Sequence, residues 1–312
     1  MSALPPALVV INPAARHGRG GTLYAGVREA VASRFTSCEV ELDRAGLWRH
    51  ALTEALSRGT RSFIAAGGDG TVNAVTSELA ARRASWPLED VRLGAVGLGS
   101  SNDFHKPVRA VVGSVPLRLD VERSTPRDVG RAIVVNDAGE RQEHCFIVSA
   151  SLGVTAHANA LFNRSSPALT LVRRHWLDGA ILLAAISAIV HHRNLRARVR
   201  VGGEEHACAL SSLSILKTPH LSGTLRFDTP VAADDGLLAV NLCQDMGHLR
   251  LVATLAGLLR GRFAGRPGTR CWRVPMVEVV LGGEADLEFD GEVVPARQIA
   301  FDVLPERIRV CA

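Results

Sequence analysis

Residues 63–76 read FIAAGGDGTVNAVT. The apolar residues 63–66 indicate a buried strand, and residues 72–76 open a helix. The glycines between them permit unusual backbone angles and leave room for a ligand, so the amide N–H groups of the loop can point at phosphate oxygens. The helix N-terminus adds about half a positive charge. The pattern predicts an anion-binding loop at a strand end, and the alternative is a tight β-α turn without a ligand. The residues assigned to this loop are Gly67, Gly68, Asp69, Gly70, Thr71 and Asn73.

Two further loops follow predicted strands. The strand at 93–96 leads into GLGSSNDF at 97–104, where serine hydroxyls can donate to phosphate and Asn102 or Asp103 can cap a helix. Residues 11–21 read INPAARHGRGG, in which Asn12 can face a nucleotide and Arg16 or Arg19 can pair with phosphates. Ligands of open α/β sheets bind at the carboxyl ends of neighbouring strands. The three loops therefore predict one phosphate-binding site, to which we also assign Asn12, Arg16, Gly99, Ser100, Ser101 and Asn102.

Strand-like and helical runs alternate over the first hundred residues. Strands are predicted at 7–11, 37–42, 61–66 and 92–96, and helices at 22–34, 48–57 and 72–83. Such β-α repetition indicates a parallel sheet with helices on both faces. From about Val121, short β-rich runs between Gly, Pro and Asp turns predict a mainly antiparallel β domain, interrupted by helices at 177–191 and 249–262. We predict an α/β domain at 1–121, a β domain at 122–304, and a tail at 305–312 that returns to the first domain.

The composition indicates a two-domain protein without disulfides. The chain has 312 residues, of which 47% are hydrophobic and 21% are charged. Its six cysteines contain no C-x-x-C pair and are typical of buried thiols in a reducing cytosol. The N-terminus lacks a signal-peptide pattern, and the apolar run at 177–190 is shorter than the roughly 20 residues of a membrane span. We therefore expect a cytoplasmic protein, and its modest net charge of +5 leads us to expect no nucleic-acid partner.

Five ordered motifs resemble those of the diacylglycerol kinase catalytic-domain family, which includes bacterial lipid kinases and sphingosine kinases. The resemblance covers essentially the whole chain. It implies a first domain similar to those of 6-phosphofructokinase and NAD kinase, followed by a C-terminal β-sandwich. It also implies ATP and Mg²⁺ as cofactors and the hydroxyl of a membrane lipid as the phosphoryl acceptor. The motifs are Asn12-Pro13, Gly67 to Thr71, Gly99 to Phe104, Asp234-Asp235-Gly236-Leu237-Leu238 and Asp290-Gly291-Glu292.

The resemblance assigns catalytic roles to three carboxylates. Glu292 is implied as the general base, since a carboxylate within hydrogen-bond reach of the lipid hydroxyl can take its proton during phosphoryl transfer. Asp69 and Asp103 are the carboxylates nearest to the Mg²⁺ that bridges the ATP phosphates. Without the resemblance, residues 289–292 indicate only a hairpin turn.

A second magnesium site is implied at the Asp-Asp-Gly-Leu motif. Its ligands would be the side chain of Asp235 and the backbone oxygens of Ala232 and Leu237. An all-oxygen ligand set suits a hard cation. Without the resemblance, this composition indicates only a turn.

The sequence also departs from the family pattern. Leu42 stands where bacterial members commonly have a threonine that contacts the nucleotide. Ala15-Arg16 and Ser100-Ser101 replace serine-glycine and threonine-alanine, and nucleotide binding should survive these exchanges. Residues 217–224, KTPHLSGT, stand where an asparagine and a glycine-rich turn are usual, and this difference bears on substrate choice.

The leading hypothesis is an ATP- and Mg²⁺-dependent kinase that phosphorylates a diacylglycerol-like lipid. Sphingoid bases, ceramide and phosphatidylglycerol are alternative substrates, because each presents a hydroxyl beside apolar chains. NAD kinase shares the loop at 67–71, and a catalytically silent nucleotide or lipid sensor is the alternative from another class. The retained Asp69, Asp103 and Glu292 favour an active enzyme.

Peripheral membrane contact and a homodimer are further expectations. The helices at 177–191 and 249–262 have apolar faces and end near arginines, a combination that suits an anionic membrane surface. Covering the β core would explain the same apolar faces.

Overall fold

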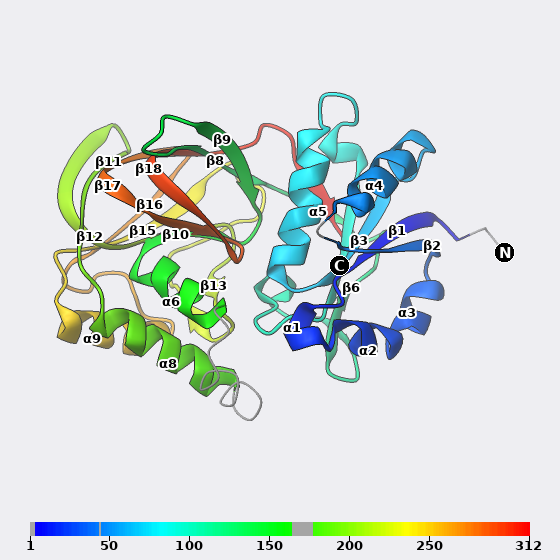
Figure 1. The fold of residues 1–312 in the computed structure, drawn as a ribbon, viewed down its shortest axis with the longest axis horizontal. Helices are drawn as coiled ribbons and strands as arrows, with labels where there is room; N and C mark the ends of the chain where they lie inside the picture. The colour runs from blue at the N-terminus through cyan, green and yellow to red at the C-terminus, as the bar shows by residue number, and fades with distance from the viewer. Residues whose placement is uncertain (1–3, 44, 164–176) are drawn as a thin grey trace. The chain divides into compact units, whose positions relative to one another are not determined.

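The chain divides into two compact units (Figure 1). The computed structural model describes residues 4–43, 45–163 and 177–312. The first unit is Met1–Val129 with Pro305–Ala312, and the second is Gly130–Leu304. The sequence placed the first boundary at 121. The next residues stay in the first unit because strand β7 (Thr125–Arg127) pairs there with the C-terminal strand β19 (Ile308–Val310).

The first unit contains a mixed eight-stranded sheet with a parallel centre. Strands β2, β1, β3, β4 and β19 are parallel neighbours in this order, and β7 closes the edge antiparallel to β19. Every residue of β3 is buried, because helices cover both faces of a central parallel strand. The strands are β1 Pro6–Ile11, β2 Thr36–Glu41, β3 Ser62–Gly67, β4 Arg92–Gly97, β5 Ala110–Val112 and β6 Val115–Arg118.

The helices of the first unit follow the strands as the β-α pattern predicts. The helix expected at 22–34 is divided into α2 and α3, with Gly26 and Val27 between them. Leu52 and Leu56 of α4 and the valines of α5 turn inward and are buried. The helices are α1 Ala15–Gly18, α2 Gly20–Ala25, α3 Arg28–Ala32, α4 Leu47–Ser57 and α5 Asp69–Ala81, with 3₁₀ turns η1 Leu88–Asp90 and η2 Asp103–His105.

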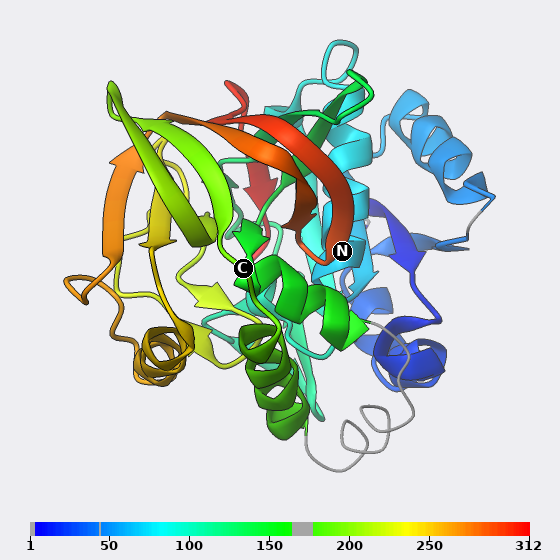
Figure 2. The same cartoon turned by 60° about the vertical axis from the view of Figure 1, so that its left-hand side comes forward.

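The second unit is built on a nine-stranded antiparallel sheet that encloses its own hydrophobic core. The sheet order is β16-β15-β12-β10-β17-β18-β8-β9, and β11 pairs with both β12 and β17. The long strands β17 and β18 lie side by side and curve strongly (Figure 2). The strands are β8 Gly130–Val135, β9 Arg141–Phe146, β10 Ser149–Gly153, β11 Leu195–Val201, β12 Glu204–Leu216, β15 Leu238–Gln244, β16 Thr269–Val274, β17 Met276–Phe289 and β18 Glu292–Val303.

Three helices and a small hairpin complete the second unit. Helices α6 (Val154–Asn163), α8 (Leu177–Val190) and α9 (His248–Leu258) gather on one side of the strands (Figures 1 and 2). The hairpin pairs β13 (His220–Leu221) with β14 (Leu225–Arg226). Helix α6 was not predicted. Residues 141–153 form two strands, β9 and β10, which are separated by Ile147 and Val148.

The two architectures confirm the predicted fold class, a parallel α/β unit followed by a mainly antiparallel β unit.

Candidate functional site

The loop between β3 and α5 holds the backbone close to the side chain of Thr71. A Cβ added at Gly67 would lie 2.1 Å from the Thr71 Oγ1 atom, so this position requires glycine. Asn12, directly after β1, donates from Nδ2 to the same Oγ1 atom over 3.0 Å. The predicted residues at the ends of β1 and β3 are therefore brought together.

The loops after β3 and β4 touch through two glycines. A Cβ added at Gly99 would lie 2.5 Å from the Gly68 Cα atom, and one at Gly68 would lie 3.1 Å from the Gly99 Cα atom. The Asp69 carboxylate joins the same two loops, since it accepts the backbone N–H groups of Asp103 at 3.0 Å and Phe104 at 2.9 Å. The two predicted phosphate loops therefore form one continuous backbone surface.

Asp69 and Asp103 lie close enough to influence each other's charge. Burial, together with the negative charge of Asp103, raises the pKa of Asp69 to about 7, although two backbone N–H groups act in the opposite direction. The Asp103 carboxylate is almost fully buried and forms an ion pair with Lys106 at 2.7 Å. Because both oxygens of Asp69 accept amide N–H groups, Asp69 also holds the second loop against the first.

Asn102 shapes the second loop. Its backbone is left-handed, with φ of 48°, a conformation that asparagine tolerates better than most residues. Its Oδ1 accepts the Gly99 N–H at 3.0 Å, and its Nδ2 donates to the carbonyls of Gly97 and Gly99. Ser100 and Ser101 lie within this turn and are half-buried.

The remaining residues predicted for this site lie in helices. Gly70 and Asn73 belong to α5, and Asn73 is buried and accepts the Ser77 hydroxyl at 3.3 Å. Arg16 lies in the short helix α1 and is half-buried.

The Asp290-Gly291 pair forms the two-residue turn between β17 and β18. Both residues have positive φ, 48° and 98°, which is the backbone that an Asp-Gly hairpin turn favours. The Asp290 carboxylate is buried and accepts the N–H groups of Ile147 at 2.7 Å, Val148 at 3.1 Å and Ser149 at 2.8 Å. Asp290 therefore anchors the turn to the segment between β9 and β10.

Glu292 begins β18 directly after this turn and is exposed. A third carboxylate, Glu288, is buried beside it and accepts the Ser151 hydroxyl at 2.7 Å and the Gly291 N–H at 2.8 Å. Among the three carboxylates at the turn, Glu292 is the one open to a substrate.

The residues expected to bind a second magnesium ion surround a lysine ammonium instead. Lys217 Nζ donates to the carbonyls of Leu237 at 2.7 Å and Ala232 at 3.3 Å, and lies 3.5 Å from Asp235 Oδ1. The other oxygen of Asp235 accepts a hydrogen bond from Arg273 at 2.5 Å. The Lys217 ammonium thus contacts the oxygens of Ala232, Asp235 and Leu237 that were predicted to ligate Mg²⁺.

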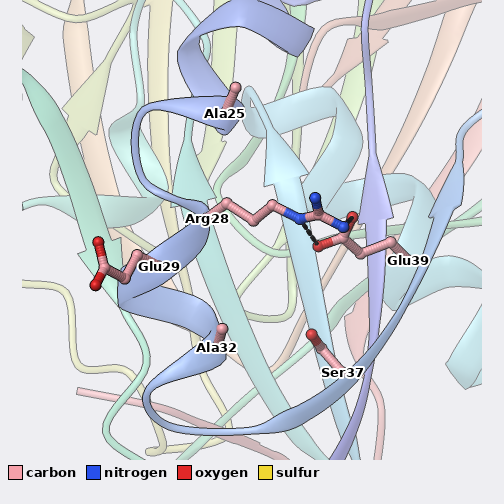
Figure 3. Close-up of a pocket in the computed structure, with 6 residues that line it drawn as sticks. All are labelled: Ala25, Arg28, Glu29, Ala32, Ser37 and Glu39. Carbon is pink, nitrogen blue, oxygen red and sulfur yellow. Dashed lines mark hydrogen bonds and ion pairs between the residues drawn. The ribbon is translucent and has the colours of Figure 1, made fainter.

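A pocket on the first unit contains none of the predicted site residues (Figure 3). An ion pair between Arg28 and Glu39 spans it from α3 to β2. Burial and the hydrogen bond to Glu39 raise the pKa of Tyr24 above its usual range. We do not assign this pocket to the reaction. Its lining is Ala25, Arg28, Glu29, Ala32, Ser37 and Glu39.

Three site residues were missed at the sequence level, namely Lys106, Lys217 and Glu288. The rarity of lysine in the sequence could have identified the two lysines. They are the only two lysines among 36 lysine and arginine residues, and each forms an ion pair with an aspartate of a recognised motif. A lysine ammonium is more compact than the planar guanidinium of arginine. Glu288 had no comparable signal, since its position in β17 is typical of any strand residue.

Comparisons with known proteins agree with this arrangement. Residues 6–131 match the diacylglycerol kinase catalytic domain, and residues 148–312 match the YegS C-terminal NAD kinase beta sandwich-like domain. The chain is 28% identical over 265 residues to a "Probable lipid kinase YegS-like" protein of Pseudomonas aeruginosa, covering 84% of this chain and 80% of that protein.

Solved structures share the fold. A diacylglycerol kinase from Bacillus anthracis superposes with a TM-score of 0.67 at 16% identity, covering 100% of this chain and 97% of that one. Yeast NADH kinase superposes with a TM-score of 0.51 at 10% identity, covering 100% of this chain and 84% of that one. The two domain matches together span nearly the whole chain, and the chain belongs to the diacylglycerol kinase catalytic-domain family as a YegS-like lipid kinase, a phosphotransferase.

Proposed function

We propose that the protein transfers the γ-phosphoryl group of ATP to the hydroxyl of a diacylglycerol-like lipid. The observation that carries the proposal is the contact between Gly68 and Gly99, which brings two glycine loops and the N-terminus of α5 together without side-chain bulk. Backbone N–H groups of such loops bind phosphate oxygens. This surface therefore holds the nucleotide phosphates, and Asn12 and Thr71 fix its edge.

The adjacent negative charges of Asp69 and Asp103 fit the expected Mg²⁺ ion. Their mutual repulsion contributes to the raised pKa of Asp69, and a cation beside them would relieve it. When bound, Mg²⁺ neutralises charge on the phosphates of ATP.

Glu292 acts as the general base in this proposal. As the new bond forms between the lipid oxygen and γ-phosphorus, the bond from γ-phosphorus to the ADP oxygen breaks, and Glu292 accepts the proton of the lipid hydroxyl. The carboxylates of Asp290 and Glu288 are buried, whereas Glu292 is exposed, and this difference in exposure favours Glu292 for the role.

Peripheral contact with an anionic membrane belongs to the same proposal. Helix α9 exposes Leu249 and Val252 in its first half and Leu259 directly after its end, and α8, which contacts α9, exposes further apolar side chains. Exposed apolar residues flanked by arginines suit the surface of an anionic bilayer. Among the described residues, no helix is long and apolar enough to cross a membrane. The exposed apolar residues of α8 are Leu183, Ile186 and Val190.

Radiolabelled ATP incubated with a total lipid extract tests the reaction, with the labelled product identified by mass. We expect label in a lipid of the diacylglycerol class. The Glu292→Gln variant keeps the size and one acceptor oxygen of the side chain but has almost no basicity, so turnover should fall by roughly 10²- to 10⁴-fold while ATP affinity stays the same.

Asp290→Asn is the matched control, because it changes a buried anchor of the same turn and should reduce stability. Near-normal turnover of Glu292→Gln on the identified lipid would exclude Glu292 as the base. In a parallel incubation with NAD in place of the lipid extract, label that enters NAD while none enters lipid would replace the lipid kinase assignment with an NAD kinase.

A further inference from the structure

Lys217 is a fully buried cation directly after β12. Its side chain has 0% of its surface exposed, whereas charged side chains are seldom buried without partners. Its backbone N–H donates to the carbonyl of Val148, in the segment that also binds the Asp290 carboxylate. The lysine therefore lies inside the second unit, next to the anchor of the turn that precedes Glu292.

Three oxygen atoms face the ammonium group. Two are the carbonyl oxygens of Leu237 and Ala232, and the third is Oδ1 of Asp235. An ammonium group has three N–H donors, so the number of donors equals the number of these acceptors. The oxygens belong to residues 232–237, which we call the 232–237 loop and which leads into β15.

The distances from Lys217 Nζ to these oxygens are those of an ammonium group, and they are too long for a small metal ion at the same position. They run from 2.7 to 3.5 Å, the range of hydrogen bonds and ion pairs, whereas Mg²⁺ requires oxygens at about 2.0–2.1 Å in octahedral geometry. Asp235 also faces Arg273, so a divalent cation added here would meet two positive side chains. Among the described residues, no group of three or more His, Cys, Asp or Glu side chains is arranged to hold a metal.

The contacts of Asp235 agree with this view. Its Oδ2 pairs with Arg273 and its Oδ1 faces Lys217 and accepts the Leu237 N–H at 3.0 Å. The carboxylate is therefore already paired with two cationic side chains of the chain itself.

We propose that the ammonium of Lys217 is the resident cation of the 232–237 loop, in place of a divalent metal. The loop then keeps its shape at any concentration of Mg²⁺, because its cation is covalently part of the chain. Removal of the lysine side chain should expose three oxygens and create a site that a divalent metal can enter.

Thermal unfolding of the full chain without nucleotide tests the proposal, in EDTA and in millimolar Mg²⁺ or Ca²⁺. For Lys217→Ala we expect the Tm of the second unit to fall by roughly 10 °C in EDTA, since the substitution empties a fully buried site and leaves the oxygens of Ala232, Leu237 and Asp235 without their ammonium donor. Divalent cations should restore several degrees of that loss in Lys217→Ala. Any other cation site is present in both proteins. The difference between their changes in Tm on addition of divalent cations therefore reports on the 232–237 loop alone.

Lys217→Met is the matched control, because methionine fills a similar volume without charge. It should lower the Tm as Lys217→Ala does, but with no recovery in divalent cations, since no space opens for them. Asp235→Asn combined with Lys217→Ala should also abolish the recovery. A Lys217→Met protein as stable as the wild type would overturn the proposal.

The single variant Asp235→Asn keeps the proposal testable if Lys217→Ala does not fold. With Lys217 present, it should lower the Tm equally in EDTA and in Mg²⁺. If the wild type instead gains stability from Mg²⁺ and Asp235→Asn loses that gain, a metal occupies the loop and Lys217 is not its cation.

Discussion

Two carboxylates of one three-residue motif have different environments. Asp290 is buried and bound by three backbone N–H groups, whereas Glu292 is exposed at the start of β18. The three amide hydrogen bonds fix the position of the Asp290 carboxylate. A carboxylate therefore anchors the turn at position 290 and lies at the surface at position 292.

Asp69 leads to a prediction about pH. Its pKa is about 7 in the folded protein, above the value of 3.8 that is usual for aspartate, so the folded state binds a proton more tightly than the unfolded state. This protonation stabilises the fold below about pH 4, and the contribution is lost as the pH rises to 7. We expect the free energy of unfolding of the wild type, relative to Asp69→Asn, to decrease between pH 4 and 7 and to be constant above.

Urea unfolding without nucleotide or metal measures this difference at each pH. Titrating groups that do not interact with Asp69 cancel between the two proteins, so the difference reports on the pair of Asp69 and Asp103. The loss of one acceptor oxygen in Asp69→Asn adds an offset that does not depend on pH. A difference that stays constant between pH 4 and 7 would mean that the pKa of Asp69 is not raised.

At the scale of elements, the two glycine loops depend on each other. Gly68 precedes α5, Gly99 follows β4, and their backbones meet with no room for a side chain between them. Substitution at either position should separate the loops, whatever the size of the new residue.

Gly99→Ala should therefore reduce ATP affinity by at least about tenfold while the strands remain folded. Its Cβ would clash with the Gly68 Cα atom, a backbone atom that no side-chain rotation can move away. Calorimetric titration with ATP measures the affinity, and circular dichroism checks the fold. Gly283→Ala is the control, because an added Cβ there meets no atom within 4 Å. Equal ATP affinity in both variants would remove the loop contact from the nucleotide site.

Helix α9 gives a second prediction at this scale. Arg260 and Arg262 follow its exposed apolar residues, and each basic residue near an anionic surface contributes about 1 kcal/mol to binding. Changing both arginines to glutamate should weaken binding to anionic vesicles by roughly tenfold to a hundredfold, more at low salt than at high salt. Sedimentation with vesicles measures the bound fraction. Arg196 and Arg198 on the exposed side of β11 provide a control with the same change in net charge. Equal binding by both variants would mean that α9 only covers the β core.

At the scale of the whole molecule, the two ends of the chain belong to one unit. The second unit is inserted in the sequence between Val129 and Pro305, and β19 then returns to pair with β4 and β7. Ile308 and Val310 of this strand are buried in the first unit. The parallel sheet of the first unit is therefore complete only when the last residues are in place.

Ile308→Ala should lower the free energy of unfolding of the first unit by about 2–5 kcal/mol, the usual cost of emptying a fully buried isoleucine site. Denaturant unfolding followed by a probe in the first unit measures it. Val293→Ala, at a valine with 39% of its surface exposed, should change stability by less than about 0.5 kcal/mol. If Ile308→Ala also changes little, β19 does not support the sheet in solution.

The sequence by itself determined the alternation of the main strands and helices over the first hundred residues, the two glycine loops and the Asp-Gly turn. These features are local, because the periodicity of apolar residues and the backbone angles that require glycine are both set within a few neighbouring positions. Helix α6 and the break between β9 and β10 could not be predicted in this way. The break exists because Ile147 and Val148 direct their N–H groups to Asp290, far away in the chain.

Only the tertiary structure decided what each charged group does. Asp69 binds the amides of Asp103 and Phe104, and Lys217 takes the place that the motif alone assigned to a metal at Asp235. Local sequence shows that a carboxylate is present, but its pKa and its partner depend on which distant residues are folded against it. The roles of these side chains are therefore properties of the packed chain and not of the motifs that contain them.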